Sequence, residues 1–170
     1  METTKTPSIT SSLIKGLLIS LVVIAIQTTA QLANFNEASW FKFAPVVVLV
    51  VALVLNGVHY SKQMSNNVIF GKIFGYGFKT TAVIALVMMA YSVLLFTVIS
   101  PELKEQAIQQ ARDQMEKENF SEEKIKSAIL FLNKNFILIT SGTSLFVNVF
   151  VGAIASLLSA AVAKKKPIYT

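Results

Sequence analysis

The chain has 170 residues, of which 54% are hydrophobic and only 14% are charged, and its formal net charge is +6 at pH 7. Soluble domains carry about 25% charged residues, so this composition excludes an ordinary soluble domain and indicates a membrane protein. The chain contains no cysteine, which excludes disulfides, thiolate nucleophiles and thiolate metal sites. We expect no nucleic-acid partner, because basic residues are not interleaved with aromatic ones as in a binding platform.

Four stretches are apolar over the roughly 20 residues that a helix needs to cross a bilayer. The first predicted span covers residues 13–33 and has a face of small and amide side chains, namely Gly16, Ser20, Gln27 and Gln31. Because an unpartnered amide in lipid is costly, we expect this face to pack against other helices. Basic Lys5 and Lys15 before a short apolar core also resemble a secretory signal peptide, so cleavage is an alternative.

The second and third predicted spans cover residues 43–60 and 78–99. His59, the only histidine, closes the second span beside an aromatic residue, and we interpret it as interfacial. A single histidine without cysteine or neighbouring acids predicts no metal site, and we expect no cofactor. The glycines of "GKIFGYGFK" before the third span lack the spacing of a phosphate-binding loop, so we expect a close-packed turn there.

A polar segment, residues 100–135, separates the third span from the fourth and has the pattern of two amphipathic helices. The apolar stripe of the first contains Leu103, Ala107, Ile108, Ala111 and Met115, and that of the second contains Ile125, Ala128, Ile129 and Leu132. Asn119 and Phe120 break the pattern between them, and Ser121 is typical of a helix N-cap. This pattern predicts a helical hairpin that docks a partner, lies on the membrane surface or only connects two spans.

The fourth predicted span, residues 137–163, carries a small or polar residue at every fourth position: Ser144, Asn148, Gly152, Ser156 and Ala160. Small residues let transmembrane helices approach closely, and polar ones bond across the interface. Two interpretations stay open, packing among the four spans and a dimer interface.

The predicted fold is all-α: one membrane domain over residues 1–170, a four-helix bundle with an extracytoplasmic amphipathic hairpin between spans three and four. Four spans place both termini on one side of the membrane. That side has eight basic residues against Glu2, namely Lys5, Lys15, Lys62, Lys72, Lys79, Lys164, Lys165 and Lys166, and the other side has seven basic residues against eight acids. The positive-inside rule therefore predicts cytoplasmic termini.

The stretches "FGKIFGYGFKT" before the third span, "ISPELKEQAIQQARDQME" after it, "SEEKI" before the fourth and the final "KKKP" together resemble the family called domain of unknown function 4199. The resemblance covers nearly the whole chain. It implies a small four-span protein of the inner membrane of Gram-negative bacteria, and it implies no activity and no catalytic residue.

Two functions fit these observations. The first is a non-enzymatic accessory or scaffold subunit of the inner membrane, which contacts a membrane or periplasmic protein or further copies of itself. The alternative is a small-molecule carrier or channel, with a polar path lined by Gln27, Gln31 and Asn148. No acidic residue lies in a predicted span core, unlike the relays of proton-coupled transporters. We expect no enzyme, because nothing resembles a catalytic set.

Overall fold

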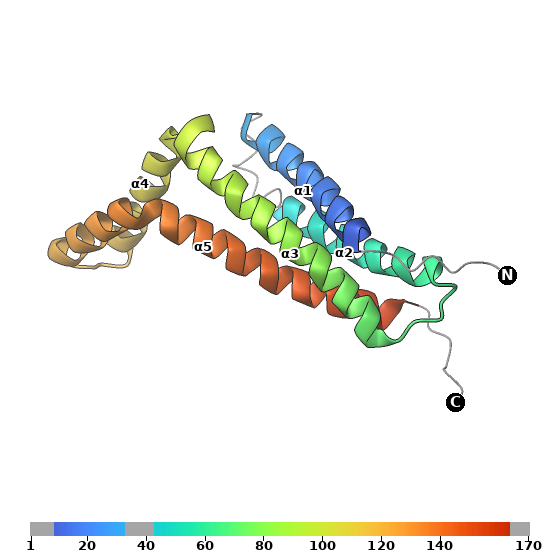
Figure 1. Cartoon of the computed structure of the whole chain (residues 1–170). Coiled ribbons are helices and arrows are strands. Elements are labelled where there is room, and N and C mark those ends of the chain that lie inside the picture. Colours follow the sequence, from blue (N-terminus) through green and yellow to red (C-terminus); the bar gives the residue numbers. More distant parts are fainter. Residues whose placement is uncertain (1–8, 33–42, 164–170) are drawn as a thin grey trace. The chain divides into compact units, whose positions relative to one another are not determined.

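The computed structural model describes residues 9–32 and 43–163, with side chains at 12–30 and 43–163 (Figure 1). This part of the chain forms helices with short connections and contains no strand, which confirms the predicted all-α class. The elements are α1 (Ile9–Leu32), α2 (Ala44–Gln63), α3 (Phe70–Leu94), a π-helical turn η3 (Leu95–Ile99), α4 (Glu102–Lys117) and α5 (Glu122–Val162).

Four helical stretches of the described chain are long and apolar enough to cross a membrane. They are Ser12–Ala30, Ala44–Gln63, Phe70–Ile99 and Glu122–Val162. The protein is therefore a multi-pass membrane protein by the length and composition of its helices.

The chain divides into two compact units, whose boundaries fall inside α3 and α5. Among the described residues, unit 1 consists of α1, α2, α3 up to Met88 and α5 from Phe146. Unit 2 is the continuous stretch Met89–Leu145.

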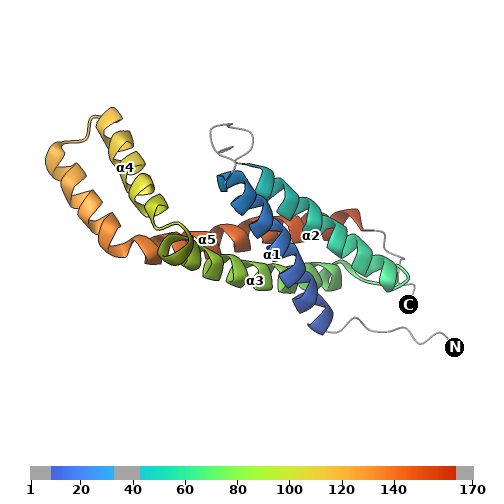
Figure 2. The same ribbon diagram turned by 90° about the horizontal axis from the view of Figure 1, so that it is seen from above.

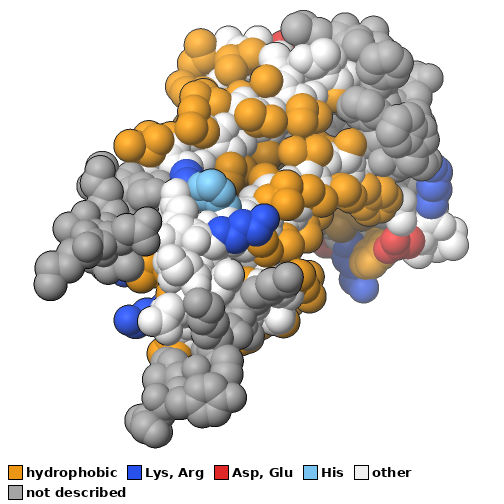
Figure 3. Space-filling view, turned by 90° about the vertical axis from the view of Figure 1, so that its right-hand side faces the viewer, with side chains coloured by type: hydrophobic (Ala, Val, Ile, Leu, Met, Phe, Trp, Pro, Cys, Tyr) orange, Lys and Arg blue, Asp and Glu red, His pale blue; other side chains and the backbone are white. Residues whose placement is uncertain are grey.

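In unit 1, the distribution of polar and apolar side chains between the interior and the surface is that expected of a protein in lipid. Small polar residues are buried between the helices, among them Ser12, Ser20, Ser61, Thr80, Thr81, Ser156 and Ser159. Many large apolar side chains are exposed, including Leu17, Leu21, Val47, Val51, Leu86 and Phe150, and Figure 3 shows hydrophobic side chains spread over one face. Lipid tails solvate apolar surface as well as a protein core does, so helices in a membrane associate through close packing of small residues.

The end of unit 1 where α2 turns into α3 holds a buried cluster of Tyr60, Val68, Ile73, Tyr76, Ala160 and Ala163. The rings of Tyr60 and Tyr76 stack with centroids 4.2 Å apart. Ser65 and Asn66 adopt positive φ angles of 52° and 60° in the connecting turn, a conformation that asparagine tolerates better than most residues. The turn therefore returns the chain directly, so that α3 packs against α2.

Within unit 2, α3 widens into η3. The Ser100 N–H donates to the carbonyl of Leu95 over 2.8 Å and closes this wider turn. Pro101 follows, and a proline disfavours a helical conformation in the residue before it. Ser100 is accordingly not helical, with φ −147° and ψ 70°, and α4 begins immediately afterwards.

A short connection between α4 and α5 reverses the chain at Asn119, whose φ is 58°. The Phe120 N–H donates to the carbonyl of Met115 over 3.1 Å and satisfies the end of α4. Figure 2 shows α4 and the first turns of α5 running in opposite directions. The two elements are the polar helix pair of unit 2.

The second polar helix and the fourth span are continuous and form the single 41-residue helix α5. No proline interrupts this stretch, and its polar residues bond back into the helix. Asn135 Nδ2 donates to the carbonyl of Phe131, and the hydroxyl of Thr140 donates to the carbonyl of Phe136. The change from polar to apolar composition near Ile137 therefore leaves the helix intact.

Candidate functional site

Gly16 of α1 and Gly152 of α5 lie at close helix contacts within unit 1. A Cβ atom on Gly16 would lie 2.7 Å from Cβ of Val83, so α1 touches α3 there. A Cβ on Gly152 would overlap the side chain of Thr81, which brings α5 against α3. The hydroxyls of Ser20 and Ser156 donate to the carbonyls of Gly16 and Gly152 over 2.6 and 2.7 Å. These hydroxyls are thus satisfied inside their own helices.

Two further glycines, which the sequence analysis did not single out as packing residues, make equivalent contacts. A Cβ on Gly57 of α2 would overlap the Ser159 hydroxyl, and one on Gly77 of α3 would lie 2.8 Å from that of Ser156. The turn predicted for "GKIFGYGFK" is wrong, because these residues form the first turns of α3. Ile73, Tyr76 and Thr80 recur at helical spacing in this segment and are buried.

The remaining residues of the predicted packing faces have mixed surroundings. Ala160 is buried in the cluster of unit 1. Gln27, Ser144 and Asn148 are half-buried. Gln31 lies in α1, but its side chain is outside the described residues.

The apolar stripes of the polar helix pair are only partly covered. In α4, which is described over its full length, no residue is buried, and Leu103, Ala107, Ile108, Ala111 and Met115 are all half-buried. On α5, Ile125 is buried, whereas Ile129 and Leu132 are half-buried. Phe136 connects the helix pair to the end of the third span. Its ring packs edge-on against that of Phe96, with centroids 5.1 Å apart, and the Lys104 ammonium lies 6.0 Å from the centre of the Phe136 ring.

The polar side chains of α4 pair along the helix surface. Gln109 donates to Asp113 over 2.8 Å, and Gln114 donates to Glu118 over 2.7 Å. Arg112 lies 3.6 Å from Glu116. Each such pair contributes about 0.2–0.5 kcal/mol to an isolated helix, so α4 is stabilised largely by its own residues.

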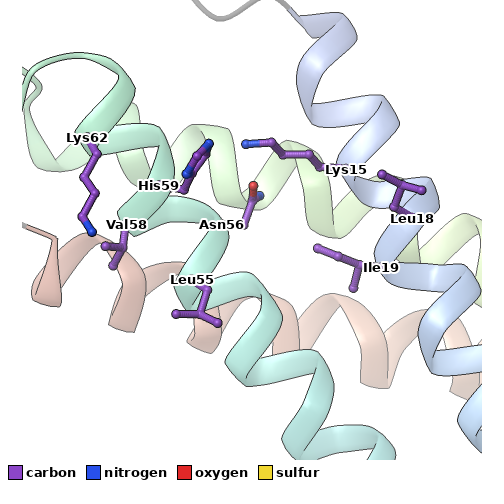
Figure 4. Close-up of a pocket in the computed structure, with 8 residues that line it drawn as sticks. All are labelled: Lys15, Leu18, Ile19, Leu55, Asn56, Val58, His59 and Lys62. Carbon is purple, nitrogen blue, oxygen red and sulfur yellow. The ribbon is translucent and has the colours of Figure 1, made fainter.

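A cavity of about 500 Å³ lies between α1 and α2 in unit 1 (Figure 4). It is lined by Lys15, Leu18, Ile19, Leu55, Asn56, Val58, His59 and Lys62. Among the described residues that line it, none is acidic. We call it the α1–α2 pocket.

Lys15 extends from α1 toward α2 at this pocket (Figure 4). Its ammonium is buried and has no hydrogen-bond partner among the described residues. It lies 5.6 Å from the centre of the Tyr76 ring, whose electron-rich face attracts a cation. The stacked Tyr60 in turn holds the Tyr76 ring, so the ammonium is positioned while its three donors stay unused.

Asn56 supplies the second unsatisfied group, and its orientation follows from its neighbours. Thr80 donates its hydroxyl proton to the Tyr76 carbonyl over 3.1 Å, so the Thr80 oxygen can only accept. Asn56 must therefore present its NH₂ group to Thr80, at 3.2 Å. This leaves Asn56 Oδ1 without a partner in the described part of the chain, although the residue is only 7% exposed.

The mouth of the pocket is basic. Lys62 is exposed there, and His59 shares a 3.0 Å hydrogen bond with Gln63. Figure 3 shows lysine side chains beside the histidine on this face. The residues that the structure describes contain no group of three metal-ligating side chains, and we assign no metal to the pocket.

His59 was expected to be interfacial, and the pocket was not predicted from the sequence. One signal was available, because Asn56 is a polar residue inside an otherwise apolar span. Two consecutive spans run in opposite directions, so the start of the first meets the end of the second. This relation places Lys15 beside Asn56, His59 and Lys62.

A protein-family model with the description "Protein of unknown function (DUF4199)" matches residues 10–165. The match covers nearly the whole chain and confirms the resemblance seen in the sequence. No curated protein and no solved structure matches the chain.

Proposed function

Since the chain belongs to the DUF4199 family, described as proteins of unknown function, we propose its role from its own residues. It is a non-enzymatic accessory or scaffold subunit of the inner membrane of a Gram-negative bacterium. Its four apolar helices form a bundle in the bilayer, and both termini lie in the cytoplasm. The polar helix pair projects on the opposite side and contacts a protein partner there.

The surface of α4 carries this proposal. Its charged and amide side chains pair with one another along the helix, and none of its residues is buried. A helix of this composition is too costly to place in hydrocarbon. Because it is stabilised by its own side chains, α4 is folded before a partner arrives, and a preformed surface loses less conformational entropy on binding.

The length of α5 supports the position of the helix pair outside the bilayer. Its 41 residues extend about 60 Å, about twice the thickness of the hydrocarbon core. The charged residues of α5 lie between Glu122 and Lys134. The apolar part from Ile137 onward is long enough to cross, and the first part then lies in water.

The charges of the described residues support the orientation. Lys15, Lys62 and Lys72 lie near the ends of helices that share the side of the termini, Lys79 lies further along the first half of α3, and the described residues at these ends contain no acid. Glu102, Glu105, Glu122 and Glu123 belong to the other side. Basic residues are retained in the cytoplasm, which supports an extracytoplasmic helix pair.

A carrier or channel receives no comparable support. The hydroxyls of Ser20 and Ser156 lie on the polar faces that such a path would use. Both residues are completely buried, and both hydroxyls bond to carbonyls of their own helices. We therefore interpret these faces as packing surfaces.

Photo-crosslinking in living cells tests the proposal. A photoreactive residue at Gln109 of α4, which is exposed, is expected to give one reproducible adduct with another protein. The same residue at lipid-facing Leu86, also exposed, serves as the control and should not give that adduct. Adducts between copies of the chain alone would replace the accessory role with self-association. The absence of protein adducts at Gln109 and at neighbouring exposed positions would contradict both.

A further inference from the structure

The α1–α2 pocket has no part in the proposed scaffold role, yet it holds two buried polar groups that have no hydrogen-bond partner among the residues that the structure describes. We propose that it binds the headgroup of an anionic phosphodiester lipid that carries a hydroxyl group. The lipid comes from the membrane leaflet at this end of the spans. Three features of the pocket point to such a lipid: its cations, an amide oxygen that accepts no hydrogen bond from the described residues, and its apolar walls.

The cations of the pocket require an anion. The Lys15 ammonium is buried without a hydrogen-bond partner among the described residues, and buried charges in proteins are normally paired. The ring of Tyr76 holds it in place without using its donors. Lys62 and His59 add basic groups at the mouth, and the described lining residues include no carboxylate that could neutralise them. A phosphate oxygen is a suitable acceptor for such ammonium donors.

The amide oxygen of Asn56 requires a donor on the same ligand. Thr80 fixes the amide so that Oδ1 is the atom without a partner in the described part of the chain, and a buried acceptor without a partner is costly. A phosphodiester has no proton to donate at neutral pH. A hydroxyl beside the phosphate supplies the donor, so the pocket favours a polyol headgroup over a bare phosphodiester.

The apolar walls indicate a lipid instead of a soluble phosphate. Leu18 and Ile19 lie one turn further into the first span than Lys15, and Leu55 lies one turn deeper in the second span than His59. Leu18 is 58% exposed and Leu55 is 61% exposed, so this wall opens toward the bilayer. The pocket is therefore basic near the membrane surface and apolar below it. A lipid has the matching order, with its anionic headgroup at the surface and its acyl chains below. Its volume of about 500 Å³ is that of a small-molecule site.

Native mass spectrometry of the full chain in detergent, titrated with phosphatidylglycerol, tests the proposal. K15Q should weaken binding about tenfold or more, because it removes a charge-assisted hydrogen bond. K72Q is the matched control, since it removes the same charge from an exposed position on α3. Its affinity for the lipid should stay within about twofold of that of the unchanged protein. If K15Q does not fold, K62Q replaces it, because Lys62 is exposed and its loss should weaken binding about threefold.

Three comparisons of ligand complete the test on the unchanged protein. Phosphatidylcholine, which has no net charge, should bind at least tenfold more weakly than phosphatidylglycerol. Phosphatidylmethanol keeps the charge but lacks the hydroxyl, and it should bind severalfold more weakly. Soluble glycerol phosphate should not compete at concentrations that saturate with lipid.

Each comparison has an outcome that overturns part of the proposal. Equal losses of lipid affinity in K15Q and K72Q would show that binding reflects only a general attraction between a basic surface and acidic lipid. Equal binding of phosphatidylmethanol would remove the role assigned to Asn56. Competition by glycerol phosphate at the same concentrations would show that a soluble phosphate, and no membrane lipid, is the occupant.

Discussion

Single glycines decide how closely the helices of unit 1 approach one another. At Gly152 an added methyl group would overlap the side chain of Thr81, whose branching at Cβ leaves it few alternative rotamers. At Gly75 an added methyl group meets nothing within 4 Å. The two positions lie on helices of the same unit, and they differ in whether the neighbouring helix leaves room.

This difference predicts opposite effects of one substitution. Gly75→Ala should raise the free energy of unfolding by up to about 1 kcal/mol, because alanine loses less entropy in a helix than glycine does. Gly152→Ala gains the same helix propensity but overpacks the contact with Thr81, and overpacking costs about 1–3 kcal/mol. It should therefore lower stability. Thermal unfolding of both variants in the same detergent measures the signs, and stabilisation by Gly152→Ala would contradict the close contact.

Residue patterns indicated small-residue packing but not which partner each residue meets. The spacing of Gly152 and Ser156 placed them on one face of a helix, and periodicity alone could not select Thr81 and Gly77 as their neighbours. The α1–α2 pocket was missed for the same reason, since Lys15 and Asn56 come from different helices. Contacts between helices depend on rotation and depth, which a single sequence does not encode locally.

Among the elements, α4 depends most on its own residues. It has a row of paired side chains and no buried residue, so intrinsic helix propensity contributes more to it than to the apolar spans. Gln110 is exposed on this helix, and substitutions there change propensity without changing packing.

Gln110→Gly should therefore loosen α4 selectively. Glycine costs about 1 kcal/mol relative to the best helix formers, which corresponds to roughly fivefold faster amide exchange in α4. Exchange in α1 and α2 should not change, since they belong to unit 1. Hydrogen–deuterium exchange with mass spectrometry measures both regions, with Gln110→Ala as the control that should not accelerate exchange. Acceleration in all helices would contradict the independence of α4.

The elements followed from composition more fully than the contacts did. Apolar runs predicted the helical class, and helix formers with a stripe of spacing four predicted a helix where α4 lies. One junction was predicted incorrectly, because the glycines at the start of α3 were interpreted as a turn. The polar segment and the fourth span were each expected to be helical, and the sequence did not indicate that they join in one helix, α5. Within a membrane-spanning helix, glycine allows close packing against a neighbouring helix. A change from polar to apolar residues can mark the membrane surface, and it does not end the helix.

At the scale of the whole molecule, the proposed role depends on which side of the membrane each connection between the helices occupies. The α2–α3 turn is basic at both of its ends, with Lys62 and Lys72. The polar helix pair combines acids with bases on the other side of the third span. The charge difference predicts the orientation, and the scaffold role requires the helix pair to face away from the cytoplasm. The lipid pocket requires only that its own end lie at a membrane surface.

Single-cysteine labelling in spheroplasts tests this orientation most directly, and the absence of native cysteine gives it a clean background. Gln110→Cys in α4 and Asn67→Cys in the α2–α3 turn are both exposed positions. A maleimide that cannot cross the membrane should label Gln110→Cys in intact spheroplasts, and Asn67→Cys only after permeabilisation. The reverse pattern would place the helix pair in the cytoplasm and contradict the account. Labelling of both positions before permeabilisation would contradict the four-span topology itself.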